Sequence, residues 1–302
     1  MESSRRLTVL DAPSNLGLKP CPTGEPGVKH LARALRAHGL IEQLQAEDAG
    51  MVVPSTYEGA MDPILKVRNA EKIRDYSRQL ANQVERLLER GQFPIVLGGD
   101  CSILVGIALA LRKRGRHGLF FVDGHTDLLT PAESETGGVA GMDLAIVTGT
   151  GPKLLTDIDG QEPYLQSSDV AVFGYRWPAA DDTSSATPWP PMMAFPLDLI
   201  RQQGVGEAAR SAVTYLETAF EGQFWVHCDV DVLAPEWMPA VDSPDPGGMS
   251  PHELAITLST AFASAHCIGL DITIYDPTLD PGEDGADLVV DLLVKSLQSG
   301  AV

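Results

Sequence analysis

The chain has 302 residues, 44% hydrophobic and 21% charged, which fits one large α/β domain or two small ones at roughly 100–200 residues per domain. It carries 22 Lys and Arg against 41 Asp and Glu, a formal net charge of −19, and such an acidic surface argues against nucleic acid and anionic membrane surfaces as partners. No apolar run approaches the roughly 20 residues of a membrane-spanning helix, and no signal peptide is visible. The four cysteines are scattered along the chain, which is typical of a reducing compartment. We therefore expect a cytoplasmic protein.

Six short apolar segments predict strands, and helical patterns separate them. Near-continuous apolarity over so few residues is typical of strands that are buried on both faces of a parallel sheet. In chain order the segments are Leu7–Leu10, Phe93–Leu97, Gly118–Val122, Val170–Phe173, Phe224–Val230 and Ile268–Ile274.

Two helices can be placed from their own signals. Ser250, Pro251 and Glu253 form a capping box with proline at the first helical position, which predicts a helix start. An earlier helix is predicted to end near Gly91, because apolar residues before it recur at helical spacings. These residues are Ile64, Val67, Ala70, Ile73, Leu80, Val84, Leu87 and Leu88.

The alternation of strands and helices predicts an α/β fold with a mainly parallel sheet and helices on both sides. The turn-rich stretch 178–191 is the best candidate for a long surface loop, and it is too short to link independent domains. We therefore predict a single domain over residues 1–302.

Acidic motifs end two of the predicted strands. One is Asp123-Gly-His125-Thr-Asp127, and the other is Asp229-Val-Asp231. In an extended chain, residues two apart project to the same side, and parallel sheets place their sites at the carboxyl ends of strands. A lone Asp-x-Asp is typical of a turn, but burying four carboxylates without cations costs several kcal/mol for each charge. The two motifs together predict a pair of divalent metal ions.

A third motif, Gly98-Gly-Asp-Cys-Ser102, follows a strand but lacks the lysine of a phosphate-binding loop. In this order, the three motifs and Gly269-Leu-Asp271 resemble the arginase/agmatinase (ureohydrolase) family over most of the chain. The resemblance implies a three-layer, arginase-like fold with an eight-stranded parallel sheet, assembled as a trimer or hexamer. It also implies a hydroxide, held by two manganese ions, that attacks a guanidinium carbon and releases urea.

Carried onto this chain, the resemblance assigns ligands to the two ions. Asp123 and Asp229 would bridge them. Asp127 would complete one ion and, as the catalytic residue, hydrogen-bond the hydroxide. His125 and Asp231 would complete the other ion.

The remaining family ligand is a histidine, and its position is occupied by Cys101. A thiolate binds divalent ions but shifts the preference from manganese towards zinc, nickel or cobalt. Cys101 could instead be a small buried hydrophobic residue, as most free cysteines are. Both interpretations stay open.

Other departures concern the substrate. The family histidine that shuttles protons falls at Ala140, and the glutamate that receives the guanidinium group falls at or beside Ile274. Family residues that contact arginine are replaced by Leu129 and by the segment that begins at Thr136. These losses argue against arginine and agmatine. Thr136 and Asp242 are candidate substrate-binding residues, although Asp242 could equally make a turn hydrogen bond beside its prolines.

Three functional hypotheses follow. The first is a metal-dependent hydrolase of a C–N bond in another linear amidine or guanidino compound. The second is a single-metal amide hydrolase, similar to deacetylases, that uses Asp123, His125 and Asp229. The third is a catalytically degenerate family member that acts as a partner subunit.

Overall fold

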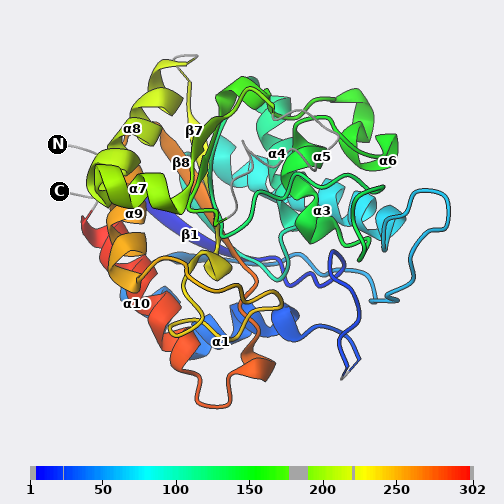
Figure 1. Ribbon diagram of the computed structural model, residues 1–302, viewed down its shortest axis with the longest axis horizontal. Coiled ribbons are helices and arrows are strands. Elements are labelled where there is room, and N and C mark those ends of the chain that lie inside the picture. The colour runs from blue at the N-terminus through cyan, green and yellow to red at the C-terminus, as the bar shows by residue number, and fades with distance from the viewer. Residues whose placement is uncertain (1–4, 23, 177–189, 220–221, 300–302) are drawn as a thin grey trace.

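A computed structural model describes residues 5–22, 24–176, 190–219 and 222–299 (Figure 1). Over these residues, eight strands form one sheet in the order β2-β1-β3-β8-β7-β4-β5-β6, and every neighbouring pair is parallel. The predicted parallel α/β sheet is confirmed. The strands are β1 (Arg6–Asp11), β2 (Glu47–Met51), β3 (Gln92–Leu97), β4 (Gly118–Val122), β5 (Val170–Phe173), β6 (Met193–Phe195), β7 (Phe224–Asp229) and β8 (Cys267–Thr273).

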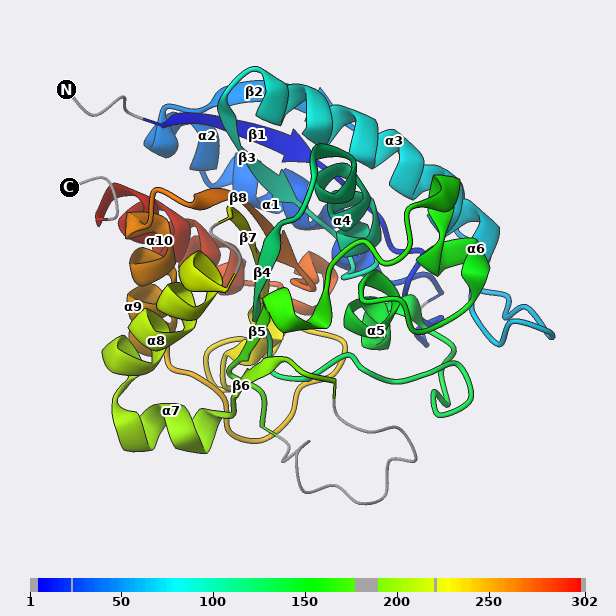
Figure 2. The same ribbon diagram turned by 90° about the horizontal axis from the view of Figure 1, so that it is seen from above.

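Helices cover both faces of the sheet, so the fold has three layers (Figures 1 and 2). One apolar core lies between the sheet and α3 to α6, and the other lies between the sheet and α1, α2 and α7 to α10. The helices are α1 (Leu31–Ala37), α2 (Leu40–Leu44), α3 (Ala70–Glu89), α4 (Ile103–Arg114), α5 (Asp143–Val147), α6 (Lys153–Thr156), α7 (Leu197–Gln203), α8 (Val205–Thr218), α9 (Pro251–Ala263) and α10 (Asp284–Ser299).

All six predicted strands are present, and β3, β4, β5 and β7 are buried along their whole length. The sequence patterns missed the two edge strands, β2 and β6. Most residues of β2 are exposed, and β6 spans only three residues. An edge strand that faces solvent needs no apolar run, so nothing in its composition marks it as a strand.

The long helix α3 begins later than its apolar pattern predicted. Ile64 is 87% exposed and lies in a turn, where Asp62 Oδ1 accepts the N–H groups of Ile64 and Leu65 at 2.8 Å. Asn69 then adopts a left-handed backbone just before the helix. The helix ends before Gly91, as predicted.

The capping box at the start of α9 is confirmed. Residues 178–189 of the predicted surface loop lie outside the described residues, and the single domain over residues 1–302 stays a prediction. Among the described helices, none combines the length and apolarity needed to cross a membrane.

The strand order brings the three sequence motifs together. Strands β3, β8, β7 and β4 are consecutive neighbours at the centre of the sheet. Because all are parallel, the loops that follow them meet at one edge.

Candidate metal centre

The loop after β3 holds Cys101 at this edge of the sheet. Gly99 passes so close to Ser14 that a side-chain carbon would lie 1.7 Å from the Ser14 carbonyl oxygen, so a larger residue does not fit. The Asp100 carboxylate accepts hydrogen bonds from the Ser14 hydroxyl at 2.9 Å and from the Ser102 N–H at 2.8 Å. The Gly-Gly-Asp-x-Ser motif therefore fixes the backbone on both sides of Cys101.

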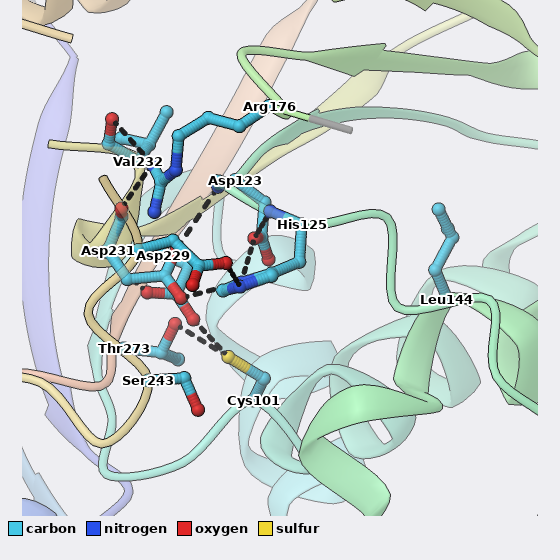
Figure 3. Close-up of polar contacts among 12 residues, drawn as sticks. Cys101, Asp123, His125, Leu144, Arg176, Asp229, Asp231, Val232, Ser243 and Thr273 are labelled. Carbon is cyan, nitrogen blue, oxygen red and sulfur yellow. Dashed lines mark hydrogen bonds and ion pairs between the residues drawn. The ribbon is translucent and has the colours of Figure 1, made fainter. Parts of the chain in front are cut away.

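Cys101 faces the acidic motifs (Figure 3). Its side chain is buried, and its thiol donates to Asp229 Oδ2 at 2.8 Å, while the Thr273 hydroxyl oxygen lies 3.1 Å from the sulfur. Burial raises the pKa of this thiol, and the charge of Asp229 raises it further. The thiol is thus protonated here, and it would need a neighbouring cation to become a thiolate.

The Asp-x-His-x-Asp motif lies in the loop after β4. Asp123 is 1% exposed; its Oδ1 accepts the His125 N–H at 2.6 Å, and its Oδ2 has no hydrogen-bond partner. His125 Nδ1 lies 2.9 Å from Asp231 Oδ2. Asp127 has a left-handed backbone with φ of 45°, and its carboxylate lies within 4.8 Å of the Cys101 sulfur.

The Asp-x-Asp motif continues the site from β7. Asp229 is the last residue of the strand, and its Oδ1 accepts the Asp231 N–H at 2.8 Å. Asp231 lies in a short 3₁₀ turn, and its Oδ1 accepts the Gly124 N–H at 3.1 Å. The motif residues therefore converge through turns beyond the strand ends, whereas the sequence argument placed them on one face of an extended chain.

Several buried acids lie close together in this cluster, and their charges shift one another's pKa values. Burial raises the pKa of Asp123, Asp127 and Asp229, and neighbouring carboxylates raise each of these pKa values further. Burial alone would lower the pKa of His125, but its hydrogen bond to Asp231 and the surrounding carboxylates raise that pKa to about 11.

One acid in this cluster was not predicted. Asp143, the first residue of α5, is completely buried, and its ligand atom lies within 4.8 Å of those of Cys101 and Asp127. Burial raises the pKa of Asp143, and the charge of Asp123 raises it further. A signal was present in the sequence, because Asp143 is the only charged residue in the apolar segment 139–147.

His227 supports the cluster from β7. Its Nδ1 lies 2.6 Å from Asp271 Oδ2, and its ring stacks on Phe121 with the ring centroids 4.8 Å apart. Its Nε2 has no hydrogen-bond partner, and the ring offers a ligand atom within 4.8 Å of those of Cys101 and Asp123. Asp271 thus fixes the orientation of a ring that borders the site.

Two further residues reach the site from outside the predicted set. Asp245 Oδ2 lies 3.0 Å from His125 Nε2, so His125 is held between Asp245 and Asp231. Arg176 Nη1 donates to the Asp231 carbonyl at 2.9 Å, while its buried Nε and Nη2 have no partner. In Figure 3, Arg176 lies beside Asp123 on the side away from Cys101.

The two predicted substrate-binding residues make local hydrogen bonds. The Thr136 hydroxyl accepts the Gly138 N–H at 3.1 Å, a hydrogen bond within its own loop. Asp242 accepts a hydrogen bond from the Ser243 hydroxyl at 3.1 Å. It is exposed to solvent, yet the surrounding protein raises its pKa to about 6, and the charge of Asp231 contributes to this shift. Neither residue lies in the groups of candidate metal ligands described below.

The positions that depart from the family are apolar. Ala140 is 9% exposed and belongs to the apolar core. Ile274 follows β8 with φ of 74°, an unusual backbone for a β-branched residue, and its N–H donates to the Gly99 carbonyl at 2.7 Å. Neither residue can carry a proton or a charge.

The cluster has the chemistry of a divalent-metal site. Three overlapping groups of side chains within the described residues bring their ligand atoms within 4.8 Å of one another. Two unpartnered, buried carboxylate oxygens, on Asp123 and Asp143, lie among them. Buried polar atoms are almost always satisfied, so these oxygens fit a bound cation. The groups are Asp123, His125 and Asp231; Cys101, Asp127 and Asp143; and Cys101, Asp123 and His227.

Comparison with known proteins agrees with the motifs. The sequence profile of the Arginase family matches residues 11–298. Arginase from Staphylococcus aureus (strain MSSA476) is 27% identical over 301 residues, which cover 97% of each chain. The crystal structure of arginase from Bacillus cereus superimposes with a TM-score of 0.84 at 25% identity, covering 97% of this chain and 98% of that one. Proclavaminate amidino hydrolase from Streptomyces clavuligerus has the same fold, with a TM-score of 0.71 at 18% identity over 98% and 92% of the two chains. The family profile spans nearly the whole sequence and includes all of its motifs, and the chain belongs to the arginase family.

Proposed function

We propose that this protein hydrolyses a C–N bond in a linear amidine or guanidino compound other than arginine and agmatine, with two divalent metal ions bound. Members of the arginase family are hydrolases of C–N bonds. The observation that carries the proposal is the cluster of candidate ligands, together with apolar side chains at Ala140 and Ile274, where the resemblance led us to expect a histidine and a glutamate.

The candidate ligands divide between two ions. Asp123 and Asp229 would bridge them, His125 and Asp231 would complete one, and Cys101 and Asp127 would complete the other. When bound, the ions lower the pKa of water and polarise the carbon under attack. Manganese is the family's usual metal, and the Cys101 thiol favours zinc, nickel or cobalt.

Asp127 is the proposed catalytic residue. Its carboxylate lies beside Cys101 and Asp143 within the cluster. The carboxylate accepts a proton from the attacking water and returns it to the nitrogen that leaves. The C–O bond thus forms as the C–N bond breaks, and the proton ends on the departing amine.

The substrate preference follows from the missing groups. Ala140 offers no proton to the leaving amine, and Ile274 offers no charge to a guanidinium group. Asp242, whose pKa is raised to about 6 by the surrounding protein and the charge of Asp231, is the proposed acceptor for an N–H group of the substrate. Thr136 is proposed to contact the other end of the same molecule.

Two ions are favoured over one. A single-metal amide hydrolase would need only Asp123, His125 and Asp229. Here a separate group of ligand atoms lies around Cys101, with Asp127 and Asp143. A single ion at Asp123, His125 and Asp229 would leave the burial of Asp127 and Asp143 uncompensated.

The test is a panel of metals and substrates. Protein stripped with a chelator is reloaded with manganese, zinc, cobalt or nickel and assayed for urea and ammonia from guanidino acids, formimidoyl compounds, arginine and agmatine. We expect turnover of a compound other than the last two, and its loss in Asp127→Asn. As a control, Asp169→Asn changes a buried acid beside the start of β5, at the opposite edge of the sheet, and should retain turnover.

Other results would favour the alternatives. Two ions per chain with no turnover across the panel would indicate a degenerate partner subunit, and one ion per chain with amide cleavage would indicate the single-metal enzyme. The trimer or hexamer and the cytoplasmic location are further proposals, tested by light scattering of the purified protein and by cell fractionation.

A further inference from the structure

Asp143 is buried without the partners that a buried carboxylate normally has. Its side chain is 0% exposed. Oδ1 accepts the N–H of Leu144 at 2.6 Å and the Asp127 carboxyl group lies close enough to share a proton with Asp143, whereas Oδ2 has no hydrogen-bond partner of its own among the described residues. In the described part of the chain, no lysine, arginine or histidine forms an ion pair with Asp143. A lone buried carboxylate of this kind is costly unless something positive binds it.

The surroundings of Asp143 are acidic as well. Asp127 and Cys101 place their ligand atoms within 4.8 Å of the Asp143 carboxylate and of each other. The charges of Asp123 and Asp229 also act on it and raise its pKa. Two loops, after β3 and after β4, and the start of α5 thus bring two carboxylates and a thiol together.

We propose that Asp143 is an additional metal ligand, which binds the same ion as Cys101 and Asp127. This inference rests on the proposed metal-dependent function. A thiolate and two carboxylates would then hold this ion on one side, and the bridging acids would hold it on the other. The resemblance to the ureohydrolases assigned no ligand to this position.

The additional carboxylate has a consequence for the substrate. With Asp143 and the Cys101 thiolate ionised, six anionic side chains would surround two divalent ions, so the centre keeps a net negative charge. These side chains are Asp123, Asp127, Asp143, Asp229, Asp231 and Cys101. A cationic amidine is attracted to such a centre. The centre itself would then replace part of the attraction that Ile274 cannot provide.

The test compares metal binding by the wild type and by Asp143→Asn, which has nearly the same shape. Cobalt(II) is titrated into chelator-stripped protein, and the thiolate-to-cobalt absorption reports the ion bound to Cys101. We expect the variant to bind this ion about 10–100-fold more weakly or worse, and its absorption band to move. Unchanged affinity and an unchanged band would overturn the proposal.

Thermal unfolding separates a ligand from a merely structural residue. Asp143→Asn should leave the Tm in chelator equal or higher, because it replaces a buried acid whose ionisation is unfavourable with a neutral group of the same shape, and should reduce the rise in Tm that cobalt causes. Asp169 is also a buried acid but pairs with Arg116, so Asp169→Asn should lower the Tm in chelator and keep the metal-induced rise. A lower Tm in chelator with an unchanged rise in Asp143→Asn would assign it a structural role.

The outcomes also separate this inference from the proposed function. If the wild type binds no ion, the metal-dependent function fails. If the wild type binds two ions and Asp143→Asn behaves identically, only the role of Asp143 fails. Should Asp143→Asn not fold, Asp143→Ser removes the carboxylate with a smaller side chain and receives the same titration.

Discussion

Cys101 replaces a neutral imidazole ligand with a group that must lose a proton to bind a metal ion. Its thiol contacts Asp229 and Thr273 and is buried. We expect Cys101→His to increase the ratio of manganese to zinc bound by at least about tenfold, because a thiolate favours softer ions than an imidazole does. Elemental analysis after dialysis against an equimolar mixture measures this ratio. The same ratio in Cys101→His and the wild type would show that the sulfur is not a ligand.

Asp245 holds the far side of the His125 ring. The carboxylate lies 3.0 Å from Nε2, while Nδ1 faces Asp231. Such outer partners orient a ligating histidine, and their loss typically weakens metal binding by about 10–100-fold. We expect this loss in Asp245→Asn for the ion that His125 binds, measured by competition with a chelator. Asp242→Asn, on the same loop but hydrogen-bonded only to Ser243 among the described residues, should keep wild-type metal affinity and raise KM instead.

The sequence could identify the motif acids but not the residues that complete their surroundings. Asp123 and Asp229 follow apolar strands, so their position at the sheet edge could be inferred from chain order. Asp143 reaches the cluster from the start of α5, outside every motif. No periodicity encodes such an approach, because the packing of the loops against the sheet edge determines it.

At the scale of elements, Gly269 of β8 packs closely against Trp225 of β7. A side-chain carbon on Gly269 would lie 2.0 Å from the Trp225 ring, and this ring is fully buried and donates to Asp271 Oδ1 at 2.6 Å. Gly269→Ala should therefore destabilise the protein by about 1–3 kcal/mol or more, as overpacking of a core does. Urea unfolding followed by circular dichroism measures the change.

Gly206 is a matched control, because alanine at this position is expected to raise the stability of the protein. Gly206 lies in α8, where an added side-chain carbon would meet only the flexible end of Arg210 at 3.4 Å and Ile256 at 3.8 Å. Gly206→Ala should stabilise the protein by about 0.5–1 kcal/mol, because glycine costs conformational entropy in a helix. If both variants shift the unfolding midpoint in the same direction, the close contact between Gly269 and Trp225 does not limit the packing of the sheet.

Helices and strands could be predicted where their burial gives the sequence a recognisable pattern of apolar residues. The central strands and the capping box of α9 could be read from the sequence. The edge strands β2 and β6 could not, because solvent covers part of each and backbone pairing alone defines them. The start of α3 was wrong for a related reason, since Ile64 fits the apolar spacing although Asp62 holds it in a turn.

At the scale of the whole molecule, the acids of the candidate centre make stability depend on pH in an unusual direction. Burial raises the folded-state pKa of Asp123, Asp127 and Asp229 above the unfolded value of about 3.9. The folded state therefore binds protons more tightly than the unfolded state does, and stability is lost as pH rises through the folded pKa values. His125, with a pKa raised to about 11, has the same sign, because its contribution is complete below about 6.5 and is lost as pH rises towards 11.

In a chelator, we therefore expect the free energy of unfolding to fall as pH rises from about 6.5 towards 11, the range over which His125 loses its proton in the folded state, by up to about 1.4 kcal/mol per pH unit for each extra proton that the folded state holds. Ordinary surface carboxylates are ionised in both states over this range and do not contribute.

With zinc or manganese present, the trend should reverse, because the ions displace these protons and bind more tightly as pH rises. Urea unfolding at several pH values, with and without metal, measures both curves. The rest of the chain is common to both samples, so their difference isolates the centre. Parallel curves would mean that the buried acids do not hold the ions.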